Sequence, residues 1–227
     1  MPRDWDADTY DRLPIPMTAW GRAVVDRLTL RGNERVVDAG CGTGQVTALL
    51  LDRLPAGRVI AIDGSPAMIE RARARLGDER VEYHVADLLE PLPVAEPVDA
   101  ILSTATFHWI DDHARLFTNL AAAMRPGAQL EAQCGGAGNI ASVIAAVRSL
   151  GVDAGIGKRY ATPAATAALL TDAGFVDVRC WLEDRPTPLP LGDLEPYLRA
   201  ICLGGVLETI PVTERDGFAR SVADRLP

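Results

Sequence analysis

Glycines and carboxylates gather where the apolar runs in the first half of the chain stop. The first run leads into Asp38-Ala39-Gly40-Cys41-Gly42-Thr43-Gly44, the second into Asp63-Gly64-Ser65, and the third into Ala86-Asp87-Leu88. Glycines let the backbone turn tightly and approach a ligand closely. A carboxylate at a strand end can accept hydrogen bonds from both hydroxyls of a ribose. These residue types predict a site for a ligand that contains a nucleoside.

The spacing of the glycines narrows the choice of ligand. Gly40, Gly42 and Gly44 follow a G-x-G-x-G pattern, whereas the dinucleotide fingerprint G-x-G-x-x-G would need a glycine where Gln45 stands. NAD and FAD are therefore disfavoured. Asp63 follows the first glycine after roughly 20 residues, which is the separation expected of a ribose-binding carboxylate.

The third strand end offers contacts for a purine ring. Asp87 could accept a hydrogen bond from an adenine amino group, with Leu88 and Met68 as apolar faces for the ring. The alternative is that Asp87 is the N-cap of a helix beginning at Leu88-Leu89, and the two roles could coexist.

Short apolar runs alternate with longer amphipathic segments, which predicts the elements that position these residues. Strands are expected at residues 35–39, 58–62, 81–85, 98–102, 128–133 and 175–182, and helices at 19–30, 45–54, 66–76, 112–124, 140–150, 164–173, 194–203 and 213–226. Ser65 is the expected N-cap of the third helix, and Arg125-Pro126-Gly127 should stop the fourth. Such alternation predicts an α/β fold: a Rossmann-like, doubly wound, mostly parallel sheet with helices on both faces and a small helical cap.

Length and charge limit the class of protein. A chain of 227 residues can form one domain, which we divide into an N-terminal lid or helix (1–30), a cofactor-binding core (31–138) and a cap (139–227). Its net charge of -8 disfavours nucleic acid as a partner, and the arginines at residues 71–75 are interpreted as one solvated helix face. We see no signal peptide or membrane-spanning stretch and expect a cytoplasmic protein. The four cysteines lie far apart, so we expect reduced thiols and no metal site.

Three consecutive aromatic residues, Phe107-His108-Trp109, follow the fourth predicted strand and are expected to face the predicted site. His108 could act as a general base, donate a hydrogen bond to an acidic substrate, or be purely structural. Phe107 and Trp109 could form a wall of the substrate pocket or pack beneath the next helix. The glycine-rich segment at residues 134–139 either passes close to the substrate or is a loop without contact.

Taken in order, residues 38–44, Asp63, Asp87 and residues 103–110 resemble the class I methyltransferases. The segment around Phe107-His108-Trp109, together with Trp5-Asp6 near the start, resembles the corresponding segments in the branch that contains trans-aconitate methyltransferase. Proteins of this family usually finish with an antiparallel seventh strand, whereas this sequence stops at Leu226-Pro227. We therefore expect either a truncated chain or a six-stranded sheet.

The resemblance implies S-adenosyl-L-methionine as cofactor and S-adenosyl-L-homocysteine as product. It implies that the three loop glycines admit the methionine part, that Asp63 binds the ribose, and that Asp87 and Leu88 contact the adenine. The expected cofactor contacts are Tyr10, Trp20, Gly40, Cys41, Gly42, Gly44, Asp63, Gly64, Ser65, Met68, Ala86, Asp87, Leu88, Ser103 and Thr104. The expected substrate contacts are Phe107, His108 and Trp109, with His108 as the candidate catalytic residue.

The predicted function is methyl transfer to a small-molecule acceptor, with oxygen, and in particular a carboxylate, as the preferred acceptor atom. A carboxylate has no proton to lose, so His108 would position it; a phenol, amine or carbon acid would need His108 as a base. C- or N-methylation, a non-catalytic cofactor-binding module, and a nicotinamide oxidoreductase (weakened by Gln45) are the alternatives. Arg148, Lys158, Arg159 or Arg179 could reach the site from the cap. The oligomeric state is left open.

Overall fold

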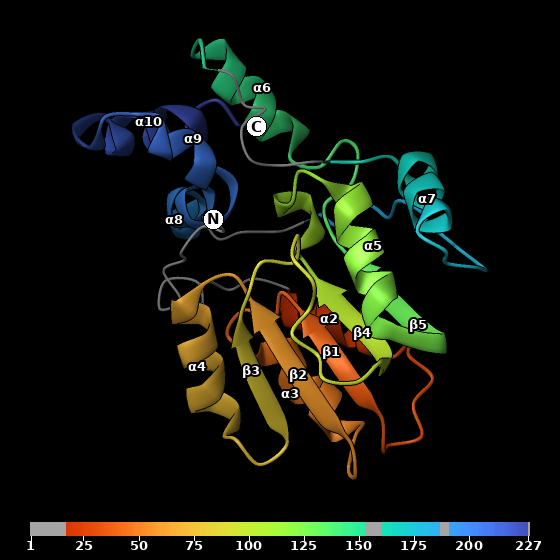
Figure 1. The fold of residues 1–227 in the computed structure, drawn as a ribbon. Coiled ribbons are helices and arrows are strands. Elements are labelled where there is room, and N and C mark those ends of the chain that lie inside the picture. The colour runs from red at the N-terminus through yellow and green to blue at the C-terminus, as the bar shows by residue number, and fades with distance from the viewer. Residues whose placement is uncertain (1–16, 153–159, 187–190, 227) are drawn as a thin grey trace.

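The protein is described by a computed structural model that covers residues 17–152, 160–186 and 191–226. In this part of the chain, five parallel strands form one sheet in the order β3-β2-β1-β4-β5 (Figure 1). Their bounds are β1 Arg35–Ala39, β2 Arg58–Asp63, β3 Val81–Val85, β4 Val98–Thr104 and β5 Met124–Gln133. The strand order reverses between β1 and β4, which makes their carboxyl ends the expected place for a ligand.

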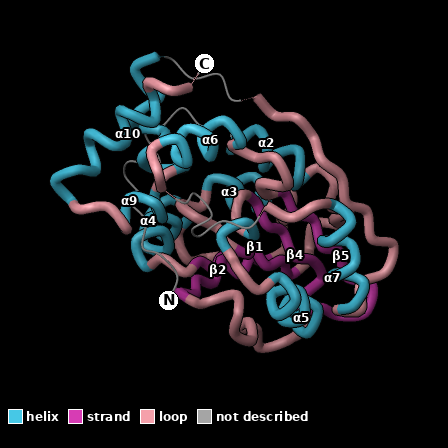
Figure 2. The backbone as a smooth tube through the Cα atoms, turned by 90° about the horizontal axis from the view of Figure 1, so that it is seen from above, coloured by secondary structure: helices cyan, strands magenta, loops and turns pink. Residues whose placement is uncertain are grey.

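Helices cover both faces of the sheet (Figure 2). One face carries α2 (Met17–Val25), α3 (Gln45–Asp52) and α4 (Pro66–Leu76), and the other carries α5 (His113–Ala123) and α7 (Pro163–Asp172). The strands bury residues on both faces, which explains why they read as continuous apolar runs. The predicted doubly wound α/β architecture is confirmed.

A third group of helices lies beyond the carboxyl ends of the strands (Figure 1). It consists of α6 (Ala141–Ser149), α8 (Leu194–Tyr197) with a π-helical turn at Leu198–Cys202, α9 (Gly204–Glu208) and α10 (Arg215–Ala223). These helices share a hydrophobic cluster of their own, in which Val147, Leu198, Leu203 and Val222 are almost fully buried. This cluster forms a small helical cap, but helix α7, which the sequence analysis counted in the cap, packs on the sheet instead.

The caps at helix N-termini follow the sequence closely. The Ser65 hydroxyl accepts a hydrogen bond from the Met68 N–H at 3.3 Å, as expected, and the Asp112 carboxylate does the same for the Arg115 N–H at 2.9 Å. The helix expected at residues 19–30 instead spans 17–25, and the one expected at 194–203 divides between α8 and the π-helical turn.

The strand predicted at residues 175–182 is wrong: this segment has no strand pairing in the structure. Asp177 lies in the left-handed region at φ 54°, which interrupts an extended backbone. Val176 is 85% exposed and Trp181 56% exposed, so two of the apolar side chains on which the strand prediction relied face solvent. The sheet in the described part of the chain therefore has five strands and not six.

Strand β5 begins earlier than predicted. It pairs with β4 from Met124 onward, and its register shifts between the pairs Val98↔Met124 and Ala100↔Gln129. The predicted stop at residues 125–127 thus lies inside the strand as an irregularity. A bulge tolerates Pro126, because the residue there need not donate to the ladder, and Gly127 adopts φ 81°.

Candidate functional site: the carboxyl edge of the sheet

The glycine loop after β1 is fixed to the end of β2. The amide groups of Gly40 and Cys41 both donate to the Ile62 carbonyl oxygen, at 2.8 and 3.0 Å. Gly40, Gly42 and Gly44 all adopt positive φ angles of 82°, 54° and 80°. L-residues with a side chain adopt these angles at a cost, which explains the repeated glycines.

The three glycines differ in what surrounds them. A Cβ atom at Gly40 would lie 2.1 Å from Oγ1 of Thr106, and one at Gly44 would lie 2.9 Å from Cδ1 of Leu76. A Cβ atom at Gly42 would meet no atom of the described residues within 4 Å. Gly40 and Gly44 therefore allow close packing within the protein, and of the three only Gly42 opens onto space that a ligand could enter.

The Asp63 carboxylate, at the end of β2, links the loop to helix α4. Its Oδ2 accepts a hydrogen bond from the Gly42 N–H and its Oδ1 one from the Ser65 N–H, each at 2.9 Å. Burial raises the pKa of Asp63, and these amide hydrogen bonds oppose the rise. Each carboxylate oxygen has two lone pairs, so the group can still accept from two ribose hydroxyls.

Asp38 is a buried carboxylate that the predicted contacts omit. It is fully buried in β1, and its Oδ2 accepts a hydrogen bond from Oγ1 of Thr47 at 2.6 Å. Its Oδ1 has no hydrogen-bond partner among the described residues. Burial raises the pKa of Asp38 to about 7, and the nearby charge of Asp63 adds to the rise. The signal in the sequence was an acidic residue at an apolar strand end, directly before the glycine loop.

Arg71, Arg73 and Arg75 are exposed, as expected of a solvated helix face, but Arg75 also contacts the glycine loop. Its Nε donates to the Thr43 carbonyl oxygen of the glycine loop at 2.8 Å. The last turn of α4 packs against the loop, because Ala72 and Leu76 lie beside Gly44. Arg75 is therefore a positioning residue for the loop, which a charge pattern alone did not reveal.

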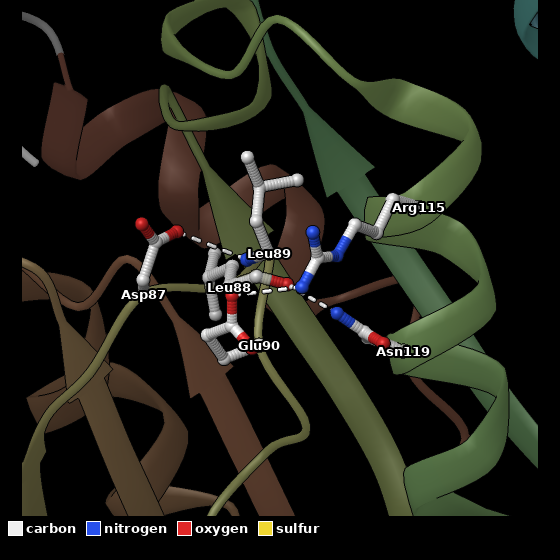
Figure 3. Close-up of polar contacts among 6 residues, drawn as sticks. All are labelled: Asp87, Leu88, Leu89, Glu90, Arg115 and Asn119. Carbon is white, nitrogen blue, oxygen red and sulfur yellow. Dashed lines mark hydrogen bonds and ion pairs between the residues drawn. The ribbon is translucent and has the colours of Figure 1, made fainter. Parts of the chain in front are cut away.

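The loop after β3 is held by its own carboxylate and by helix α5 (Figure 3). Oδ1 of Asp87 accepts a hydrogen bond from the Leu89 N–H at 3.0 Å. The Asn119 amide donates to the Leu88 carbonyl oxygen at 3.1 Å, and Arg115 pairs with Glu90 at 2.8 Å. No helix follows Asp87 in the structure, so the proposed helix N-cap is wrong and the carboxylate stabilises a turn instead.

The end of β4 joins the glycine loop through hydroxyl groups. The buried Ser103 donates to the Ala39 carbonyl oxygen at 2.7 Å. Thr106 donates from one hydroxyl to the Thr104 and Gly40 carbonyl oxygens, at 2.9 and 3.3 Å. These contacts bring the backbone of residues 103–106 beside the loop.

His108 is held in one tautomer by the glycine-rich segment after β5. Its Nδ1 accepts a hydrogen bond from the Gly135 N–H at 3.1 Å, so the neutral ring carries its proton on Nε2. The ring stacks on Tyr160, with centroids 5.8 Å apart and planes 23° apart. Trp109 lies on another side, with centroids 5.3 Å apart. Residues 134–139 therefore contact a predicted substrate residue.

The remaining predicted residues differ in burial. Phe107 is 4% exposed and packs edge-on against Phe117 of α5, which is the packing alternative of the sequence analysis. Cys41, Ser65, Met68 and Leu88 are buried, and Trp20, Gly64 and Ala86 are partly buried. Tyr10 lies outside the described residues. In the parts of the chain that the structure covers, no three His, Cys, Asp or Glu side chains gather as metal ligands.

Comparisons with known proteins agree with this arrangement. Residues 36–127 match the family model described as a methyltransferase domain. The trans-aconitate 2-methyltransferase of Azoarcus sp. (strain BH72) is 40% identical over 129 residues, which are 57% of this chain and 50% of that protein. The chain thus spans about half the length of the curated relatives it matches.

Solved structures share the fold. An S-adenosylmethionine-dependent methyltransferase from Mesorhizobium loti superposes with a TM-score of 0.57, at 24% identity over 70% of this chain and 81% of that one. A chain from the Haloferax volcanii complex of the Trm112 methyltransferase activator gives 0.61, at 22% identity over 77% of each chain.

Residues 36–127 therefore form a class I methyltransferase domain, and the sheet has the fold of the S-adenosylmethionine-dependent methyltransferases. Over 129 to 130 residues the chain is similar to trans-aconitate 2-methyltransferases. The residues at the carboxyl edge fit the cofactor of this class. Gly42 leaves space beside the loop, and Asp63 can accept from ribose hydroxyls and places a carboxylate where a cationic ligand is favoured. Of the described helices, none has the length and apolarity needed to cross a membrane.

Proposed function

We propose that this protein transfers a methyl group from S-adenosylmethionine to a carboxylate oxygen of a small acceptor. The relatives named as trans-aconitate 2-methyltransferases support this acceptor class. The observation that carries the proposal is the state of His108, whose Nδ1 is occupied by the Gly135 N–H. A neutral ring in this tautomer can donate a hydrogen bond through Nε2 but does not act as a base. This state suits a carboxylate as the methyl acceptor, because a carboxylate has no proton to lose.

The reaction needs alignment more than acid–base chemistry. Bound S-adenosylmethionine would supply an electrophilic methyl carbon attached to a sulfonium sulfur. The carboxylate oxygen would form the new C–O bond as the C–S bond breaks, and the sulfur would keep the electron pair of the broken bond. The glycine loop, Asp63 and the turn at Asp87 would fix the donor, and His108 would orient the acceptor through its Nε2 proton. No residue of the chain has to remove a proton in this step.

Cofactor binding can be tested on its own by calorimetric titration with S-adenosylhomocysteine. Asp63→Ala removes the carboxylate that holds both the loop and the ribose, so we expect affinity to fall at least a hundredfold. Asp52→Ala, at an exposed position at the end of α3, is the matched control and should bind like the wild type. Equal affinity for the two variants would contradict the assignment of Asp63.

The acceptor atom is tested by transfer of a labelled methyl group to a panel of carboxylic acids, phenols and amines. A methyl ester releases its label as methanol in mild base, whereas methyl ethers, methylamines and C-methyl products keep it. A base-labile product formed from a carboxylic acid is the expected result. Tight cofactor binding with no turnover of any acceptor would support a non-catalytic binding module instead.

A further inference from the structure

Helix α6 has two faces with different surroundings. Val143, Ala146 and Val147 are buried in the hydrophobic cluster of the cap. The opposite face lines a cavity of about 530 Å³, and its residues recur at helical spacing: Ala141, Ile144, Ala145 and Arg148. A cavity of this volume is in the range that holds small-molecule ligands.

The cavity reaches the residues beside His108. Tyr160 and Asn139 also line it, and the Tyr160 ring is the one stacked on His108. Both lie against Gly135, since a Cβ atom there would be 2.5 Å from Nδ2 of Asn139 and 2.7 Å from Cε1 of Tyr160. The Gly135 N–H is in turn the donor to His108. Tyr160 and Asn139, which line the cavity, therefore pack against the Gly135 backbone that binds His108.

The charge of the cavity favours an anion. None of the described residues that line the cavity is acidic. Arg148, in the last turn of α6, contributes a guanidinium group to the cavity. Arg148 is exposed and makes no ion pair with a described residue. Burial raises the pKa of Tyr160, so its hydroxyl stays protonated and can act as a donor. A guanidinium recognises a carboxylate through two parallel hydrogen bonds.

We propose that this cavity is the acceptor site and that Arg148 binds a second carboxylate of the acceptor, one that is not methylated. The inference rests on the proposed function and adds to it, because it selects di- and tricarboxylic acids over monocarboxylic acids. His108 then lies at the reacting end of the acceptor and Arg148 at the other end.

The test measures methyl transfer to trans-aconitate and to a series of di- and monocarboxylic acids, with S-adenosylhomocysteine affinity as the check on folding. Arg148→Gln should raise KM for the di- and tricarboxylic acids at least tenfold and leave cofactor affinity unchanged. Arg148→Lys should fall between, because it keeps the charge and loses the two-point contact. The matched control is Arg31→Gln, an exposed arginine before β1 at the opposite end of the sheet, which should behave like the wild type.

A second pair of variants tests the cavity and not the charge. Ala145→Phe places a ring in the cavity from α6, whereas Ser142→Phe adds the same ring to an exposed position of the helix that does not line it. We expect the first to raise KM for the acceptor at least tenfold and the second to leave it unchanged.

The outcomes separate the two proposals. If the wild type methylates a di- or tricarboxylic acid and both Arg148→Gln and Ala145→Phe keep its KM, the cavity assignment is overturned and the proposed function stands. If the wild type binds S-adenosylhomocysteine but neither methylates any acid nor binds trans-aconitate in calorimetry, the proposed function and the cavity assignment both fail.

Discussion

Replacing Gly40 by alanine should destabilise the fold, whereas replacing Gly42 should impair cofactor binding. Both residues have positive φ angles, which cost about 1–2 kcal/mol once a Cβ atom is present. At Gly40 the new atom would also lie 2.1 Å from Oγ1 of Thr106, and overpacking of this kind costs about 1–3 kcal/mol more. The free energy of unfolding should therefore fall by about 2–5 kcal/mol for Gly40→Ala and by about 1–2 kcal/mol for Gly42→Ala.

Urea unfolding of the two variants measures this difference, and a double mutant isolates its cause. Thr106→Gly removes the three atoms that a Cβ at Gly40 would approach most closely, so the double variant should recover the overpacking cost and keep the cost of the φ angle. In calorimetry, Gly42→Ala should lose at least tenfold in S-adenosylhomocysteine affinity, because its Cβ enters the space beside the loop. Equal stability of the two single variants, or normal affinity of Gly42→Ala, would refute the reasoning.

Two further predictions concern the neighbours of the loop. Burial raises the pKa of Asp38 from 3.8 to about 7. Between these two pH values the folded chain holds a proton that the unfolded chain has lost. The contribution of Asp38 to stability therefore declines as the pH rises from about 4 to about 7. Asp38→Asn removes the titration, and thermal unfolding at pH 5 and pH 8 should show the wild type losing up to about 3 kcal/mol more than the variant; parallel losses would contradict the assignment. Arg75→Met removes the donor to the Thr43 carbonyl oxygen and should weaken S-adenosylhomocysteine binding about fivefold to tenfold, with unchanged calorimetric affinity as the opposing result.

Features that depend on local sequence were predicted well. The strands that hold the site, the N-cap at Ser65 and the placement of Asp63 at a strand end all follow from short-range patterns of apolar, capping and acidic residues. These patterns report on the backbone of one segment at a time, so a single sequence is enough to read them.

Features that depend on which segments meet were predicted poorly. The strand expected at residues 175–182 had the right alternation, but strand pairing needs a partner edge, and Asp177 turns the backbone away from an extended course. Arg75 is exposed as expected, but its hydrogen bond to the Thr43 carbonyl oxygen was not predicted, because that acceptor is 32 residues away in the sequence.

The sequence by itself determined the order of strands and helices from β1 to α7, the doubly wound sheet, and the carboxyl-edge positions of the glycine loop, Asp63 and Asp87. Each of these features follows from the spacing and type of residues within one stretch of the chain. Only the tertiary structure decided that Gly42 opens onto space while Gly40 packs against Thr106. It also decided that the Gly135 N–H fixes the tautomer of His108, because that contact joins two strand ends that packing alone brings together.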